Sequence, residues 1–113
     1  MKAWMKVNYT VFYRNLERQT REVKNKVSQE TNRASLRVER RAKKYAPWDT
    51  GYMSMTIYSY MENTLSAVII SPAHYSIFVE LGTRYMSAQP FIYPALQEEK
   101  PKYFANLARI VGG

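Results

Sequence analysis

Apolar residues recur at helical spacing through the first half of the chain. Between Val11 and Tyr45 they are separated by steps of four and seven residues, at Phe12, Leu16, Val23, Val27, Ala34, Val38 and Tyr45. This eleven-residue repeat corresponds to about 3.67 residues per turn, which predicts one long helix over residues 10–46 with a narrow apolar stripe. Asn8 or Thr10 is its candidate N-cap.

The predicted helix is long for its domain. At about 1.5 Å per residue it spans roughly 50 Å, whereas a compact domain of this size measures roughly 35 Å across. We therefore expect the helix either to kink around Ser28–Asn32 or to project from its domain. A projecting helix would find its partner surface on another subunit.

The pattern changes at the sequence Ala46-Pro47-Trp48-Asp49-Thr50-Gly51-Tyr52. Pro47 disfavours helical geometry at Ala46, and Asp49 and Gly51 favour a turn. Residues 52–61 then alternate, which predicts a strand with Met53, Met55, Ile57 and Met61 on the core face and Tyr52, Ser54, Thr56, Tyr58 and Tyr60 on the other. A turn at Glu62-Asn63-Thr64 and a second strand over Leu65–Ser71 complete a hairpin. Residues 1–9 fit either an edge strand or a flexible arm.

The last third of the chain is punctuated by glycine and proline. Residues 73–83 predict a short helix or strand that ends at Gly82, with Glu80 paired or hydrogen-bonded among apolar neighbours, and residues 84–89 predict a loop. Residues 90–94, which begin and end with proline, predict an edge strand. Pro94 is predicted to be the first residue of a helix, which Pro101 breaks or restarts. The final helical face, which ends at Gly112, comprises Phe104, Leu107, Ala108 and Val111.

These elements predict a single α+β domain over residues 1–113. Its parts are an arm or edge strand (1–9), a long basic helix (10–46) packed on a small antiparallel sheet in a β-rich module (47–96), and a short C-terminal helix (94–111). No apolar run approaches the roughly 20 residues of a membrane span, and the first residues are too weakly apolar for a signal peptide. The chain has no cysteine, which fits folding in a reducing compartment.

Charge changes the picture of the long helix. The chain carries a formal charge of +8, and residues 10–46 hold eleven Lys or Arg against four Asp or Glu. A basic helix can follow nucleic-acid phosphates, dock on an acidic protein or simply face solvent. The candidates for such contacts are Arg33, Arg37, Arg40, Arg41 and Lys44.

Two features of the sequence suggest catalysis or metal binding, but neither is sufficient for it. Asp49-Thr50-Gly51 matches the signature of the aspartic proteases, whose dimeric members supply one carboxylate from each subunit. Pro47-Trp48 before it and the bulky Tyr52 after it favour a turn instead, in which Asp49 bonds nearby amides and Gly51 supplies a positive φ. The single histidine, His74, has no cysteine or second histidine with which to form a metal site or nucleophilic pair. We therefore expect no catalytic residue, metal or cofactor.

Three blocks in register resemble the tail-completion, or tail-to-head joining, family of long-tailed bacteriophages and prophages. They are Ala46-Pro47-Trp48-Asp49-Thr50-Gly51 with Met53 and Thr56-Ile57, then Tyr75-x-x-Phe78-Val79-Glu80-Leu81-Gly82-Thr83, then Gln89-Pro90-Phe91-Ile92-Tyr93-Pro94-Ala95-Leu96. They follow a basic helix, as in that family, and cover residues 40–96. Trp48 replaces a smaller residue, and the strand is richer in Met and Tyr than is typical.

The resemblance implies a structural virion protein of the tail or neck, assembled in the host cytoplasm and without catalysis. Such subunits form a ring, commonly a hexamer, at the head-proximal end of the tail. There they contact the major tail tube protein and the head–tail connector or stopper protein, while double-stranded DNA passes through the lumen without sequence specificity and no membrane is involved. The alternative from the residues alone is a small basic nucleic-acid-binding module, and a dimeric aspartic protease is the more remote one.

The resemblance and the residue pattern also assign roles. The expected turn and motif residues are Pro47, Asp49, Thr50, Gly51, Glu80, Gly82, Thr83, Pro90, Phe91 and Pro94. The candidate subunit or partner contacts are Tyr58, Tyr60, Arg84, Tyr85 and Phe91, because Tyr gives a large contact area at low entropic cost.

Overall fold

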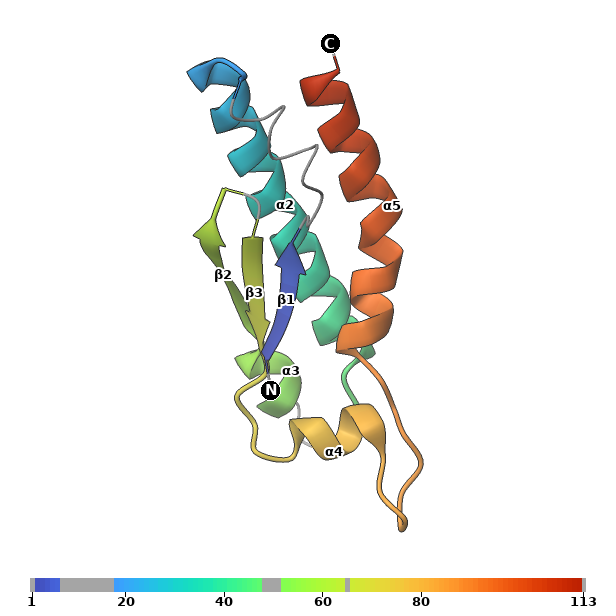
Figure 1. Ribbon diagram of the computed structural model, residues 1–113. Coiled ribbons are helices and arrows are strands. Elements are labelled where there is room, and N and C mark those ends of the chain that lie inside the picture. The colour runs from blue at the N-terminus through green and yellow to red at the C-terminus, as the bar shows by residue number, and fades with distance from the viewer. Residues whose placement is uncertain (1, 7–17, 48–51, 65, 113) are drawn as a thin grey trace.

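The computed structural model describes residues 2–6, 18–47, 52–64 and 66–112. The described elements are β1 (Lys2–Lys6), α2 (Arg21–Tyr45), α3 (Tyr52–Thr56), β2 (Tyr58–Asn63), β3 (Ser66–Ile70), α4 (Ser76–Leu81) and α5 (Ile92–Val111). Helices α2 and α5 lie side by side, the sheet covers another side of α2, and α4 lies at one end of the molecule (Figure 1). The predicted α+β class is confirmed.

Helix α2 begins later than the sequence pattern predicts. Residues 18–20 form a turn and a bend, and the Thr20 hydroxyl oxygen accepts the backbone N–H of Val23 at 3.3 Å as the N-cap. The prediction of one continuous helix over residues 10–46 is therefore wrong at residues 18–20, and the candidate caps Asn8 and Thr10 lie outside the described residues. The helix has 25 residues and runs through Ser28–Asn32 as one element. The apolar repeat continues across Thr20, but the capping hydrogen bond of Thr20 sets the start of the helix.

The apolar stripe of α2 finds its partner within the chain. Val27, Ala34, Val38 and Ala42 are fully buried, and α5 packs along the same helix. The described part of the stripe therefore needs no other subunit to cover it, contrary to expectation, while Phe12 and Leu16 of the predicted stripe lie outside the described residues. The reason is that α5 is a full-length antiparallel partner, not the short helix expected from Pro101 (Figure 1).

The corner after α2 is partly described. Ala46 adopts an extended conformation directly before Pro47, as predicted, while Trp48, Asp49, Thr50 and Gly51 lie outside the described residues. Residues 52–56 form the helix α3 instead of a strand. The Ser54 hydroxyl donates to the carbonyl of Lys43 at 3.0 Å, and the Met55 side chain, predicted to be in the core, is 79% exposed. Five alternating residues are too few to distinguish a strand from one helical turn fixed by a tertiary contact.

The sheet is antiparallel in the order β1-β3-β2, so residues 2–6 form an edge strand. β2 and β3 form the predicted hairpin, with a register shift between Met61 and Asn63. Ile69 packs in the core, and Ser59 on the same face donates to Glu39 of α2 at 3.2 Å. Tyr58 and Tyr60 therefore project from the opposite face, as predicted, since side chains alternate along a strand.

Helix α5 begins at Ile92 and continues to Val111, where Gly112 ends it as predicted. The predicted edge strand over residues 90–94 is wrong. Pro94 fits because the N–H groups of the first turn have no helical partner, so its missing N–H costs nothing. Pro101 removes one internal hydrogen bond but does not break the helix, because Glu99 and Tyr103 on either side of it are anchored to α2.

Candidate assembly interface

Glu80 joins α4 to the start of α5. Its carboxylate accepts the backbone N–H groups of Phe91 at 3.1 Å, Ile92 at 2.9 Å and Tyr93 at 3.1 Å. These are N–H groups of a helix N-terminus, which have no partner inside the helix and favour a negative charge. The expectation that Glu80 is hydrogen-bonded is confirmed. The side chain of Phe91, the N-cap residue of α5, makes no capping hydrogen bond. The Glu80 carboxylate of α4 caps the helix instead.

Gly82 turns the chain sharply after α4. Its φ is +79°, and its N–H donates to the carbonyl of Phe78 at 2.7 Å. A Cβ at this position would lie 2.7 Å from the backbone nitrogen of Ala88, so any larger residue would collide with the backbone that follows the hairpin. The predicted structural role of Gly82 is therefore explained by both its backbone angle and the space around it.

The chain beyond Gly82 forms a small hairpin, residues 83–86, called here the Thr83–Met86 hairpin. The Thr83 N–H donates to the Met86 carbonyl at 2.8 Å, and the Met86 N–H donates back at 3.2 Å. The Tyr85 N–H donates to the Thr83 hydroxyl oxygen at 3.1 Å. The hairpin lies at the end of the molecule beyond α4 (Figure 1). Residues 84–89, predicted as a loop, thus begin with a defined turn.

Arg84 and Tyr85 form a unit at the tip of this hairpin. The Arg84 guanidinium donates to the Tyr85 hydroxyl oxygen at 2.9 Å and lies 5.0 Å from the centre of the tyrosine ring. The Tyr85 side chain is nevertheless 85% exposed. Such an aromatic group held in place but uncovered is typical of protein interfaces.

Exposed apolar side chains gather around this end of the molecule. We call the set the α4 edge: Ile77, Phe78 and Leu81 of α4, Tyr85 and Met86 of the hairpin, and Tyr93 of α5. The three α4 side chains are exposed because Ser76 and Glu80 occupy the buried side of that helix. Leu81 is 70% exposed, and other exposed apolar residues lie beside it. This combination is unusual for a leucine. Grouped exposure of this kind marks a contact surface.

An apolar hollow opens between α4 and α5, called here the Glu80 hollow. It has a volume of about 400 Å³ and is lined by Glu80, Leu81, Pro90, Ile92, Tyr93 and Leu96. Two of the three sequence blocks, residues 75–83 and 89–96, meet in it because Glu80 holds the second block to the first. Their separation along the chain concealed this junction from sequence reasoning.

The predicted contact residues have different surroundings. Tyr58 and Tyr60 are half exposed on the sheet, and Arg84 and Tyr85 are exposed on the hairpin. Phe91 is fully buried, so its assignment as an interface residue is corrected, while its role as a motif residue is supported by its place in the core. Thr83 lies in the Thr83–Met86 hairpin, Pro90 lies in the irregular segment before α5, and Pro94 lies in the first turn of α5.

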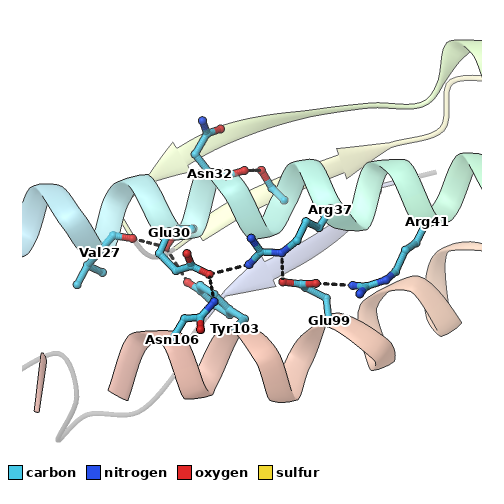
Figure 2. Close-up of polar contacts among 10 residues, drawn as sticks. Val27, Glu30, Asn32, Arg37, Arg41, Glu99, Tyr103 and Asn106 are labelled. Atoms are coloured by element: carbon cyan, nitrogen blue, oxygen red, sulfur yellow. Dashed lines mark hydrogen bonds and ion pairs between the residues drawn. The ribbon is translucent and has the colours of Figure 1, made fainter. Parts of the chain in front are cut away.

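The basic candidates on α2 also divide into two groups. Arg33, Arg40 and Lys44 are exposed, and no ion pair is recorded for them within the described residues. Arg37 and Arg41 instead point toward α5, where Arg37 Nε lies 2.6 Å from Glu99 Oε1 and Arg41 pairs with the other Glu99 oxygen (Figure 2). These two arginines are therefore engaged within the chain and not presented to a partner.

Polar residues form a network between α2 and α5 that the sequence did not predict. Glu30 Oε1 accepts from both Arg37 and Asn106, at 2.6 and 2.8 Å (Figure 2). Thr31 donates to the carbonyl of Val27, so the Tyr103 hydroxyl, 2.7 Å away, is left to donate to Thr31. The sequence did contain one signal of this network between α2 and α5. Acidic residues occur on the same helix faces as the apolar stripes.

Two pKa values reflect these helix contacts. Burial acts to lower the pKa of the Arg37 guanidinium, but its hydrogen bonds to Glu30 and Glu99 and their charges outweigh burial and raise the pKa above its usual value. The Tyr45 hydroxyl donates to the Glu98 carboxylate at 2.6 Å, which together with desolvation raises the pKa of that phenol. In both cases the raised pKa reflects contacts in the folded chain that stabilise the protonated form of the group.

Comparison of the chain with family models, curated proteins and solved structures finds no match. Within the described ranges, no group of three or more His, Cys, Asp or Glu side chains is placed to hold a metal ion, and no helix is long and apolar enough to cross a bilayer. Asp49 of the protease-like triplet lies outside those ranges. The feature of the described residues that best suits a binding role is thus the α4 edge with its hollow.

Proposed function

We propose that this protein is a structural subunit that completes the head-proximal end of a bacteriophage tail and joins it to the head. The observation that carries the proposal is the α4 edge, an exposed apolar surface formed by two of the three sequence blocks that resemble the tail-completion family and by the hairpin between them. A protein that works alone gains nothing from leaving Leu81 and Tyr85 uncovered, whereas an assembly subunit buries them on association.

The proposed assembly is a ring of like subunits, commonly six in the family resembled. A ring needs two different surfaces on each subunit, because each contact is heterologous and closes by rotation. The α4 edge is one candidate, and the tyrosine face of the sheet, with Tyr58 and Tyr60, is another. The tail tube protein and the connector or stopper protein would contact the two remaining sides of the ring.

The exposed cations of α2 suit a surface near DNA or an acidic neighbour. Arg33, Arg40 and Lys44 are seven and four residues apart on one outward face, so their backbones are separated by about 10 and 6 Å along the helix. A short row of cations attracts phosphates without reading base sequence, which fits DNA passing through a lumen. A virion location in the tail or neck is part of this proposal.

Electron microscopy of the concentrated protein, combined with a DNA titration, tests the function. The proposal predicts ring-shaped particles with a central opening and weak DNA binding that does not depend on sequence and is lost at moderate salt. Tight saturable binding of duplex DNA by a monomer or dimer would instead favour the nucleic-acid-binding module. Replacing Arg33, Arg40 and Lys44 with Ala should weaken DNA binding without preventing ring formation.

A further inference from the structure

We infer that the Arg84–Tyr85 tip of one subunit inserts into the Glu80 hollow of a second copy of this chain. The inference rests on the proposed assembly function and names the contact that would build it. It depends on three properties of the described residues: the size and lining of the hollow, the hydrogen-bonding capacity left on Glu80, and the exposure of Tyr85.

The hollow has room for a large side chain. Its volume of about 400 Å³ lies at the small end of the range for ligand sites, and apart from Glu80 and the tyrosine hydroxyl its lining side chains are apolar. A tyrosine ring buries 150–250 Å² on insertion, which makes it an effective anchor, and its polar tip needs a partner when covered. An aromatic side chain with one hydrogen-bond donor is therefore the complementary occupant.

Glu80 can provide that partner. One of its oxygens accepts two backbone N–H groups and the other, Oε2, accepts only that of Tyr93. A carboxylate has about four acceptor positions, so Oε2 retains capacity for a further donor. Glu80 is largely buried and borders the hollow, and its negative charge favours a cation close to the entering group.

The Arg84–Tyr85 tip has these complementary properties. The Tyr85 hydroxyl accepts from Arg84, so its own hydrogen is left to donate to a carboxylate, and the arginine brings a positive charge beside it. The hydrogen bonds of the Thr83–Met86 hairpin fix the tip before binding, which lowers the entropic cost of association. Tyr85 does not fill the hollow of its own subunit, because it is 85% exposed. Since each chain carries both the tip and the hollow, a second copy is the occupant we propose.

Cross-linking between two cysteine variants tests this contact, and the chain is suited to it because it contains no cysteine. Met86→Cys places a thiol beside the tip without removing Tyr85, and Gln97→Cys places one at an exposed position next to Leu96 of the hollow. The two proteins are mixed, treated with a short bismaleimide, and the joined peptides are identified by mass spectrometry. Met86→Cys mixed with Asn32→Cys, an exposed position on α2, is the matched control.

The inference predicts a cross-link between positions 86 and 97 that far exceeds the control and falls at least about tenfold when Tyr85→Ala is added to the Met86→Cys protein. A yield equal to the control, or one that Tyr85→Ala leaves unchanged, overturns the contact. The particle mass of the unmodified protein then separates the two claims. A ring-sized mass without the cross-link refutes only this contact, whereas a monomeric mass refutes self-assembly as well.

Discussion

Glu80 Oε1 lies 2.9 Å from the backbone nitrogen of Ile92, so a side chain of α4 caps the N-terminus of α5. This relationship fixes the angle between the two helices and leaves the opposite side of α4 exposed. The same carboxylate therefore serves the fold, through three backbone N–H groups, and shapes the hollow beside it.

Replacing Glu80 with Ala should lower the free energy of unfolding by about 2–3 kcal/mol, because it leaves three N–H groups at a helix N-terminus without an acceptor. Urea denaturation followed by circular dichroism measures the loss. Glu22→Ala is the control, since Glu22 is exposed in the first turn of α2 and its ion pair among the described residues is with exposed Lys26. Equal effects of the two substitutions would contradict the role given to Glu80.

Truncating Glu99 should be among the most destabilising changes in the chain. Its side chain is 1% exposed and pairs with both Arg37 and Arg41, so Glu99→Ala removes the buried partner of two partly buried cations and leaves Arg37 with Glu30 and Arg41 with the more exposed Glu98. We expect a loss of about 3 kcal/mol or more in the free energy of unfolding.

A double-mutant cycle on Arg37 and Glu99 separates their pairing from other effects. The coupling energy should be well above that of the exposed Lys26–Glu22 pair, for which less than about 1 kcal/mol is expected. A coupling no larger than that of the surface pair would show that the network between α2 and α5 is not a stabilising contact.

The contact of Tyr45 with Glu98 should make the stability of the folded protein decrease at alkaline pH. The pKa of Tyr45 is raised above its usual value of 10.0, so folding favours the protonated phenol. The resulting stabilisation is complete below pH 10 and is lost as the pH rises through the higher folded pKa. Near-ultraviolet titration of phenolate absorbance should show that Tyr45→Phe removes a group titrating later than an ordinary tyrosine. Loss of an ordinary or early titration would contradict this contact.

Gly82→Ala should destabilise the turn after α4 by about 1–3 kcal/mol, because it forces an alanine to a positive φ and places its Cβ against the backbone of Ala88. Thermal unfolding measures the change. Ser87→Ala, in the same exposed segment, should leave the melting temperature nearly unchanged. An unchanged melting temperature for Gly82→Ala would mean that the hairpin can shift without cost.

Local signals predicted a good part of this structure. The burial of Val27 and Val38 followed from periodicity, the end of α4 from Gly82, and the bonding of Glu80 from a charge among apolar neighbours. The β2–β3 hairpin also followed from local strand and turn signals, although its first strand begins at Tyr58 and not at Tyr52. Each of these depends on a few neighbouring residues, which is why a single sequence was sufficient.

The failures arose where a distant contact overrides local preference. Pro101 breaks an isolated helix, but Glu99 and Tyr103 fasten α5 to α2 on both sides of it. Arg37 and Arg41 belong to a basic run, yet their partners lie 62 and 58 residues away in Glu99. The Glu80 hollow combines residues from two such segments, so its position required the fold.

The mass of the purified protein across a concentration series, measured by light scattering, tests most directly whether the α4 edge is an assembly surface. We predict a rise to one discrete ring-sized multiple of the chain mass, which Leu81→Asp abolishes without unfolding the protein. Leu36→Asp, a matched change of an exposed leucine on α2, should leave that mass unchanged. A protein that stays monomeric at every concentration, or a ring indifferent to Leu81→Asp, would contradict the account.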